Sequence, residues 1–271
     1  MLYEYLNKIF SDDHQFAGTF KCFDLWHIGY LVILAAIVTL SIIYLKNKPQ
    51  EKREKYINIF VGIAFGLYMA DFFLMPFAYG EIDVDKLPFH SCTTMSIVCF
   101  LSSRNTFLKK YRIHFALLGL ISNLCYISYP SGVVDVPHVS YHAWQTLLFH
   151  GAMVVYGLLT IIFCGKDFKL KRSYVDLMIL AGLTVWAFIG NTLYSGSAAG
   201  YSRDFNWFFI KQDPFGAIPE SIAPLLAPFV NLVAFFGMEI IVYLIFTMIN
   251  KKQRKKQTEA KEAEEKIPAN V

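Results

Sequence analysis

Four side chains at two places in the chain could carry out nucleophilic chemistry. His90, Cys92 and Thr93 lie together at the start of an apolar run, and His150 lies inside another. A thiol or hydroxyl needs a base within hydrogen-bond reach to act as a nucleophile, and histidine is the usual base. On a helix His90 would lie over Thr93 and Thr94, and away from Cys92. Two pairings remain open: Cys92 with His150, or a threonine with His90. Buried cysteines are also common small hydrophobic residues, so packing is the alternative for Cys92.

Polar groups in other apolar runs could support such a site. Asp71 is expected either to orient one of the histidines or to be a buried, protonated acid. Asn123 and Asn191 could donate hydrogen bonds to an oxyanion. Asparagines also join membrane helices through hydrogen bonds worth about 0.6 kcal/mol each, so a purely structural role is the alternative for both.

These polar side chains are predicted to lie at a similar depth in the membrane. Six apolar runs place a polar group in the outer half, whereas the inner halves are nearly bare, with Glu239 as the main exception. The external segment 196–222 contains Asn206 and Trp207 within an aromatic stretch. Its composition predicts either a lid over the polar layer or an anchor at the membrane interface.

The elements that must position these side chains are long apolar segments. A helix needs roughly 20 apolar residues to cross a bilayer core of about 30 Å, and only helices satisfy their own backbone polar groups in lipid. The sequence therefore predicts an all-α fold, a polytopic membrane bundle of seven transmembrane helices. The predicted spans are residues 26–45, 57–79, 88–103, 113–129, 143–164, 175–195 and 223–249.

The basic residues predict how this bundle is oriented. Twenty of the 25 Lys and Arg residues lie in alternate connections and in the C-terminal tail, and basic residues accumulate on the cytoplasmic side. Residues 1–25 are therefore expected to be an extracellular N-terminal segment, 26–249 the transmembrane domain, and 250–271 a charged cytoplasmic tail. The expected location is the plasma membrane, as a multi-pass protein.

Composition excludes several classes of protein. Hydrophobic residues make up 55% of the chain and charged residues 17%, whereas a soluble domain has about 25% charged residues. The five cysteines are scattered without a CxxC pair, which supports neither a disulfide framework nor a zinc site. Nucleotide loops, metal-ligand clusters and haem motifs are not evident. We therefore expect no metal ion, no cofactor and no nucleic-acid partner. The expected partners are membrane lipids; no oligomeric state is indicated.

Several motifs resemble those of a known family. They are Phe23 to His27 at the first span, Leu87-Pro88-Phe89-His90-Ser91-Cys92, Phe149-His150-Gly151, Asn191 followed by Asn206-Trp207-Phe208, and Glu239. Together they resemble the YwaF family of bacterial integral membrane proteins over most of the chain, with a longer insertion at Ser195–Asp204. That family is similar to the eukaryotic transmembrane protein 164, a lipid acyltransferase thought to use a cysteine and a histidine. The resemblance implies acyl-transfer chemistry.

Three functions are consistent with these observations. A membrane-embedded acyltransferase or lipid hydrolase would use Cys92 or Thr93 as nucleophile and His150 as base, on a lipid or small amphiphilic substrate. A binding or transport protein would hold a small molecule or lipid in the outer pocket, although seven spans do not divide into two equal repeats. In a structural scaffold, the polar layer would serve packing alone.

Overall fold

The computed structural model describes residues 18–78, 84–138, 140–165, 168–194, 205–212 and 217–265. Within these ranges the chain is helical, and the only β-type pairing is an isolated bridge between Thr19 and Pro137. The α-helices are α2 (Leu25–Leu45), α3 (Gln50–Ala78), α4 (Ser91–Ser102), α5 (Thr106–Lys109), α6 (Arg112–Ser128), α7 (Tyr141–Cys164), α8 (Ser173–Tyr194) and α9 (Ala223–Glu265). The short 3-10 turns are η1 (Val84–Lys86), η2 (Ser131–Val133), η4 (Leu170–Arg172) and η6 (Trp207–Phe209).

The all-α prediction is confirmed, and each predicted span coincides with one helix. Five helices, α2, α3, α7, α8 and α9, are long and apolar enough to cross a membrane. The other two are shorter: α4 has 12 residues and α6 has 17. At 1.5 Å per residue, α4 is only about 18 Å long. The number of seven crossings therefore remains a prediction.

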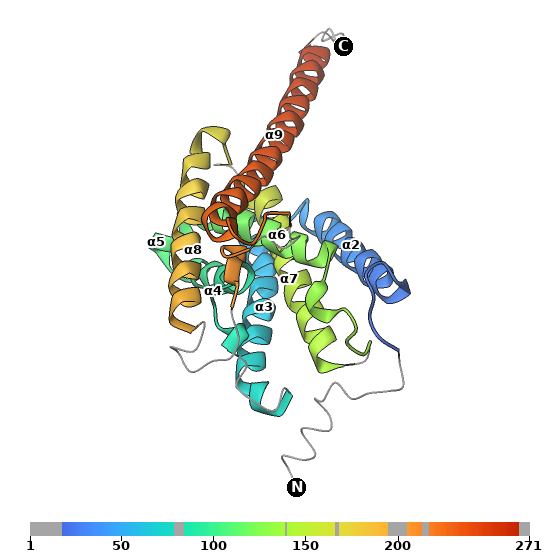
Figure 1. Cartoon of the computed structure of the whole chain (residues 1–271). Helices are drawn as coiled ribbons and strands as arrows, with labels where there is room; N and C mark the ends of the chain where they lie inside the picture. Colours follow the sequence, from blue (N-terminus) through green and yellow to red (C-terminus); the bar gives the residue numbers. More distant parts are fainter. Residues whose placement is uncertain are drawn as a thin grey trace.

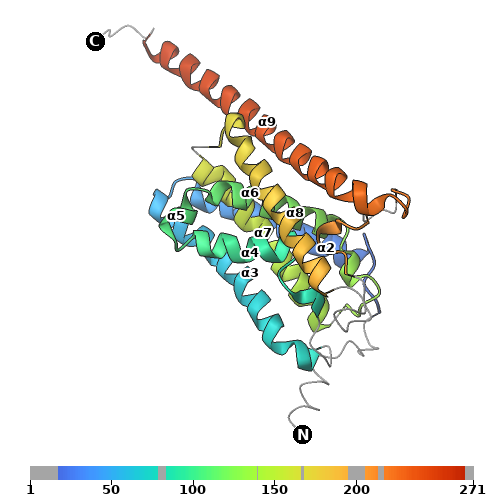
Figure 2. The ribbon, with the colours of Figure 1, turned by 60° about the vertical axis from the view of Figure 1, so that its left-hand side comes forward.

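Helix α7 is the centre of the bundle. Of the residues in its 18-residue apolar stretch, 72% are buried inside the protein, and its most extensive contacts are with α3 and α6. Small residues allow the α6 contact: a Cβ on Gly157 would lie 2.7 Å from Leu120 Cβ and 2.9 Å from the Ala116 carbonyl oxygen. Figures 1 and 2 show α7 enclosed by its neighbours, with α2 at one side of the bundle.

Helix α9 packs on α8 and then leaves the bundle. Its 43 residues form one continuous helix, although Pro228 lies within it. Both views show its C-terminal part extending away from the other helices (Figures 1 and 2). The predicted boundary at residue 250 therefore does not interrupt the helix, which continues through the basic cluster to Glu265.

Backbone pairing fixes the outer end of the bundle, by which we mean the end that carries residues 18–24 and 129–140. The Phe20 amide donates to the Val136 carbonyl at 2.8 Å, and the Asp135 amide donates to the Phe20 carbonyl at 2.9 Å. Side-chain caps start the adjoining helices: Asp24 accepts from the His27 amide, and Ser140 accepts from the Ala143 amide. These bonds tie the start of α2 to the start of α7.

Candidate functional site

His150 is held in one orientation by α6. Its Nδ1 lies 2.6 Å from Asn123 Oδ1, and its ring stacks on Tyr126 with centroids 3.8 Å apart. The Asn123 amide nitrogen donates to the Gly119 carbonyl at 2.6 Å, so the Asn123 oxygen is the atom that faces the histidine. An amide oxygen only accepts hydrogen bonds, so Nδ1 carries the proton and Nε2 presents its lone pair. Within the described residues, Nε2 has no hydrogen-bond partner. This tautomer is the one that a general base requires.

Cys92 and His150 share Tyr126 as a neighbour, and the described structure has no direct hydrogen bond between them. Cys92 is the second residue of α4, and the backbone N–H groups of Thr93 and of Cys92 itself point to its sulfur. Tyr126, on which His150 stacks, lies within electrostatic range of Cys92, as does Tyr68. Tyr126 therefore connects the two residues, and the sequence interpretation missed it. Its position three residues after Asn123 on the same helix was the available signal.

His90 and Thr93 are engaged in local contacts. His90 is the N-cap residue of α4, and its Nε2 lies 3.6 Å from Asp85 Oδ1. It is also within electrostatic range of His150. The Thr93 hydroxyl donates to the His90 carbonyl oxygen at 3.0 Å, so its proton is already used by the backbone. The sequence left open whether Thr93 is a nucleophile. In the structure its hydroxyl makes a local hydrogen bond to the backbone.

Asp71 pairs with a lysine. Its Oδ2 lies 3.6 Å from Lys86 Nζ, and it also interacts with Tyr141 at the start of α7. The expectation that Asp71 orients His90 or His150 stays a prediction. A basic residue on the predicted outer side was the signal for this pair.

Asn191 and Trp207 fasten the described part of the external segment to α8. The Asn191 amide donates to the Trp207 carbonyl at 3.0 Å and to the Ala187 carbonyl at 2.8 Å, and its oxygen accepts from the Trp207 amide at 2.9 Å. Both donors of Asn191 are thus used. Those of Asn123 contact the Gly119 carbonyl and Ser122 Oγ. This geometry favours anchoring roles over the oxyanion role for both asparagines.

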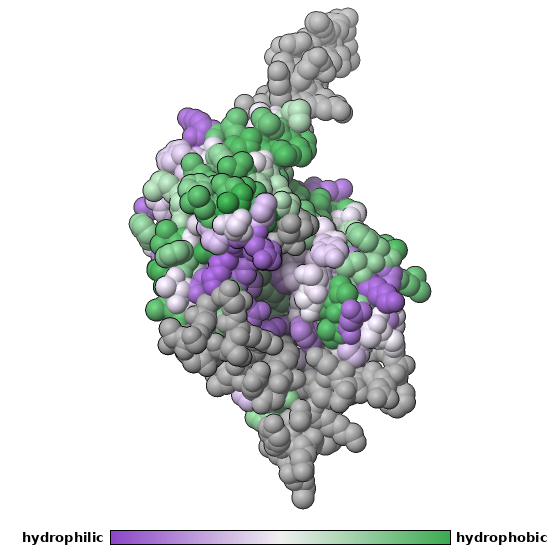
Figure 3. Space-filling view, in the orientation of Figure 1, coloured by the Kyte–Doolittle hydropathy of each residue, from purple (hydrophilic) through white to green (hydrophobic). Residues whose placement is uncertain are grey.

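Residues 205–212 form a compact aromatic plug at this end. Trp207 is fully buried, donates from Nε1 to the Asp85 carbonyl at 3.2 Å and stacks on Phe205 at 4.4 Å. The Asn206 side chain stays within the turn, donating to the Gln212 carbonyl at 2.7 Å and accepting from the Lys211 amide at 2.9 Å. Figure 3 shows hydrophilic residues bordering a hollow on this face, with hydrophobic surface on either side. Asn206 and Trp207 therefore shape the surroundings of the site without touching His150 or Cys92.

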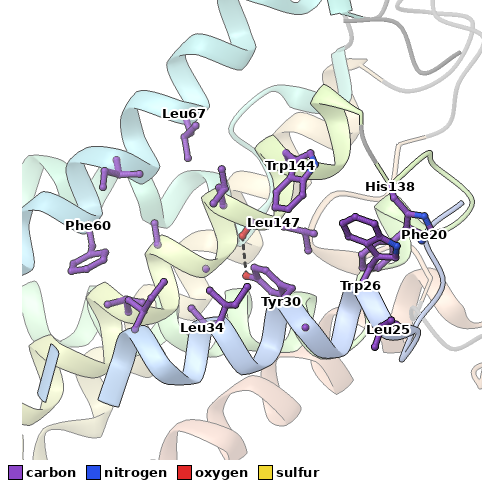
Figure 4. A pocket seen from close by; sticks show the side chains of 18 residues that line it. Phe20, Leu25, Trp26, Tyr30, Leu34, Phe60, Leu67, His138, Trp144 and Leu147 are labelled. Carbon is purple, nitrogen blue, oxygen red and sulfur yellow. Dashed lines mark hydrogen bonds between the residues drawn. The ribbon is translucent and has the colours of Figure 1, made fainter. Parts of the chain in front are cut away.

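An apolar groove of about 620 Å³ lies between α2, α3 and α7. Figure 4 shows its walls: Leu34 and Tyr30 from α2, Leu67 from α3 and Leu147 from α7, with the Tyr30 hydroxyl donating to the Leu147 carbonyl at 2.9 Å. Gly151, the neighbour of His150, also lines the groove. A Cβ at Gly151 would lie 2.6 Å from the Tyr30 hydroxyl, so glycine is required where α2 approaches α7.

The outer mouth of the groove is polar. His138 Nε2 lies 3.0 Å from Asp24 Oδ2, and its ring stacks on Trp26 with centroids 5.1 Å apart. Burial alone would raise the pKa of Asp24, but hydrogen bonds from the His27 amide, from His138 and from the Lys21 amide outweigh burial and lower it. An apolar groove with a charged mouth matches the shape of an amphiphile.

The expectation of a nearly bare inner half is wrong. His114, Asp176 and Tyr243 form a buried hydrogen-bonded cluster there, with Glu239 beside them. His114 and Asp176 lie within three residues of their helix starts. Ionisable residues so close to a basic connection resemble loop residues in sequence, and only the packing of α6, α8 and α9 shows that they are buried. Among the described residues, no group of three or more His, Cys, Asp or Glu could hold a metal ion.

Comparison with known proteins identifies the family. No curated protein and no solved structure matches the chain. The family model described as the TMEM164 family matches residues 22–256, which include every helix of the predicted transmembrane domain. The chain is therefore a multi-pass membrane protein that belongs to the TMEM164 family.

Proposed function

We propose that the protein is a membrane-embedded acyltransferase or lipid hydrolase in which Cys92 is the nucleophile and His150 is the base. The observation that carries this proposal is the fixed tautomer of His150, whose ring stacks on Tyr126, a residue within electrostatic range of Cys92. A packing histidine would not need an amide partner on Nδ1 while leaving Nε2 unbonded. Catalytic hydrogen bonds are often long before substrate binds, so the pair is expected to close on the substrate.

The proposed reaction has two steps. Cys92 Sγ attacks the carbonyl carbon of an ester while His150 Nε2 takes the thiol proton; the alcohol then leaves with that proton, and a thioester remains on Cys92. In the second step, His150 deprotonates water or an acceptor hydroxyl, which attacks the thioester and releases Cys92. The position of Cys92 in the first turn of α4 supports this role, because a helix N-terminus stabilises a thiolate and a nearby oxyanion.

The groove between α2, α3 and α7 supports a lipid as the substrate. Its walls are apolar, and Gly151, which follows His150 in the chain, is one of its lining residues. A hydrocarbon chain in this groove would be held by burial of its methylene groups, at about 0.8 kcal/mol for each. The same groove supports a second candidate function, a lipid-binding protein without catalysis.

The two functions differ in whether an acyl group becomes bound to Cys92. Purified protein in nanodiscs is incubated with a phospholipid that carries a fluorescent acyl chain, and the protein is analysed for label that hydroxylamine removes. We expect a hydroxylamine-sensitive adduct in the wild type and in Cys99→Ala, and none in Cys92→Ala. Cys99 is the matched control, because it lies on the same helix and is buried. An adduct that persists in Cys92→Ala contradicts the assignment, and lipid retention without any adduct favours the binding protein.

We further propose that all seven helices cross the plasma membrane, with the N-terminus outside, and that the chain lies in the bacterial, YwaF-like part of its family. The contact of Lys109 Nζ with Glu54 Oε2 at 2.9 Å supports this topology, because it places the α4–α6 connection beside the start of α3. In a background without native cysteines, an impermeant thiol reagent applied to intact cells should label Ser131→Cys and not Asn105→Cys. The reverse pattern would overturn the orientation.

A further inference from the structure

A sealed polar cluster joins α6, α8 and α9 in the half of the bundle opposite to Cys92 and His150. His114 Nδ1 lies 2.8 Å from Asp176 Oδ1, and the Tyr243 hydroxyl donates to Asp176 Oδ2 at 2.7 Å. Relative exposure is 0% for His114, Tyr243 and Glu239, and 1% for Asp176. Phe168 stacks on Tyr243 with centroids 4.0 Å apart and covers it. The charged groups of this cluster are therefore isolated from solvent.

An ionised Asp176 is satisfied by its two hydrogen-bond partners, since Oδ2 accepts from the Tyr243 hydroxyl and Oδ1 lies 2.8 Å from His114 Nδ1 and can accept from it. His114 Nδ1 must then carry a proton, and Nε2 is its basic nitrogen. Nε2 is buried, and no group in the described part of the chain forms a hydrogen bond with it. Asp176 thus prepares His114 to accept a second proton and would stabilise the imidazolium that results.

Glu239 provides the complementary group. It lies four residues before Tyr243 on the same face of α9, within electrostatic range of Asp176. Both of its carboxyl oxygens are buried, and neither has a hydrogen-bond partner among the described residues. An ionised, unpaired carboxylate in such a place costs several kcal/mol, so the neutral acid is the form that fits the site. Arg172 of η4 is a basic group on another element that interacts electrostatically with Tyr243.

We propose that this cluster is a proton-binding site in which Glu239 carries an exchangeable proton and His114 Nε2, positioned by Asp176, receives it. In the transfer, the Glu239 O–H bond breaks and an N–H bond forms on His114, with one water molecule bridging the two groups. Glu239 becomes a carboxylate and His114 an imidazolium paired with Asp176, so the net charge of the cluster does not change. Buried acid and histidine chains of this kind move protons in membrane proteins.

Infrared spectroscopy of the full chain in dodecyl maltoside, a detergent without a carbonyl group, tests the first half of the proposal. At neutral pH we expect a protonated-carboxyl C=O band that is lost in Glu239→Gln and kept in the matched variant Asp176→Asn. Labelling glutamate with ¹³C at the carboxyl carbon should shift the band in the unmutated protein, which keeps the test decisive if either variant fails to fold. A band that is absent, that does not shift, or that is lost in Asp176→Asn instead overturns the proposal.

Exchange in D₂O tests the role of His114. The Glu239 band should shift as its proton is replaced by deuterium, and His114→Phe should slow this exchange at least tenfold. A packing defect would admit water and accelerate the exchange, so slower exchange is specific to a relay. Unchanged or faster exchange in His114→Phe would contradict the proposed transfer. Neither measurement depends on the acyl-transfer proposal.

Discussion

Two of the buried histidines in the bundle, His150 and His114, have different partners, and the partner determines what each can do. His150 is hydrogen-bonded to the neutral amide of Asn123, whereas His114 is hydrogen-bonded to the carboxylate of Asp176. A neutral acceptor fixes the tautomer without adding charge, which leaves a base that can give up its proton again. A carboxylate favours the charged imidazolium and holds it. The same side chain is therefore suited to catalysis in one place and to proton storage in the other.

The surroundings of the two histidines also differ in how exposed they are. Around His150, the neighbouring Lys86 and His90 side chains are 23% and 30% exposed. Around His114, every member of the cluster is sealed. A lipid ester could reach the first region, whereas only a proton or a water molecule could reach the second.

The largest expected effect is on acyl transfer, which should depend on the region around His150 and not on the cluster around His114. His150→Ala should lower acyl transfer by about 10²- to 10⁴-fold, the usual contribution of a general base. Glu239→Gln should change it by less than about threefold, because the inner cluster does not contact the substrate in our proposal. Release of the labelled acyl chain from the phospholipid, measured with both variants at equal protein concentration, checks this difference. Equal losses in both variants would mean that the two regions act as one site.

For stability we expect the larger loss in the buried His114–Asp176 cluster and the smaller loss in the region around His150. Asp176→Ala leaves His114 and Tyr243 without their acceptor in a sealed site, and each buried donor left unsatisfied costs about 1–3 kcal/mol. Asp71→Ala should cost about 1 kcal/mol, because its partner Lys86 is partly exposed and can turn to water. The free energy of unfolding in detergent, measured for both variants, checks this. A larger loss for Asp71→Ala would show that the outer region is the more rigid one.

Packing of the aromatic plug gives a smaller effect. A Cβ on Gly190 would lie 2.4 Å from the Phe89 ring, which packs on Trp207. Gly190→Ala should therefore cost about 1–3 kcal/mol through overpacking. Gly182 on the same helix has nothing within 4 Å of its added Cβ, so Gly182→Ala should be neutral or stabilising by about 0.5–1 kcal/mol. Thermal unfolding of the two variants tests this. Equal unfolding midpoints would show that α8 can move away from the Phe89 ring without a loss of stability.

The sequence predicted the helices well because hydrophobic length is a property of a single segment. The seven predicted spans match seven helices, and the boundary errors fall where polar residues continue a helix, as at Gln50 and beyond Ile249.

Contacts between helices were not predictable in this way. The pairs Asp71–Lys86 and His114–Asp176 join segments whose relative rotation depends on packing, such as the Gly157–Leu120 approach. Cys92 and His150 stood out as candidates because their residue types are rare in apolar runs, and their catalytic roles stay a prediction. Tyr126 was missed because tyrosine is common there.

The smallest expected effect concerns the outer mouth of the groove, where Asp24 pairs with His138. The pKa of Asp24 is lowered in the folded protein, because the hydrogen bonds from His27, His138 and Lys21 outweigh its burial. A carboxyl whose folded pKa is lower than its unfolded value of about 4 contributes stability above that value, and loses it as pH falls through the folded pKa. Asp24→Asn should therefore destabilise the protein by about 0.5–1 kcal/mol at pH 7. The difference from the wild type should shrink below about pH 4, where the wild-type carboxyl is itself protonated. Unfolding midpoints of both proteins between about pH 3 and 7 measure it, and a difference independent of pH would mean that Asp24 acts only through its shape as the cap of α2.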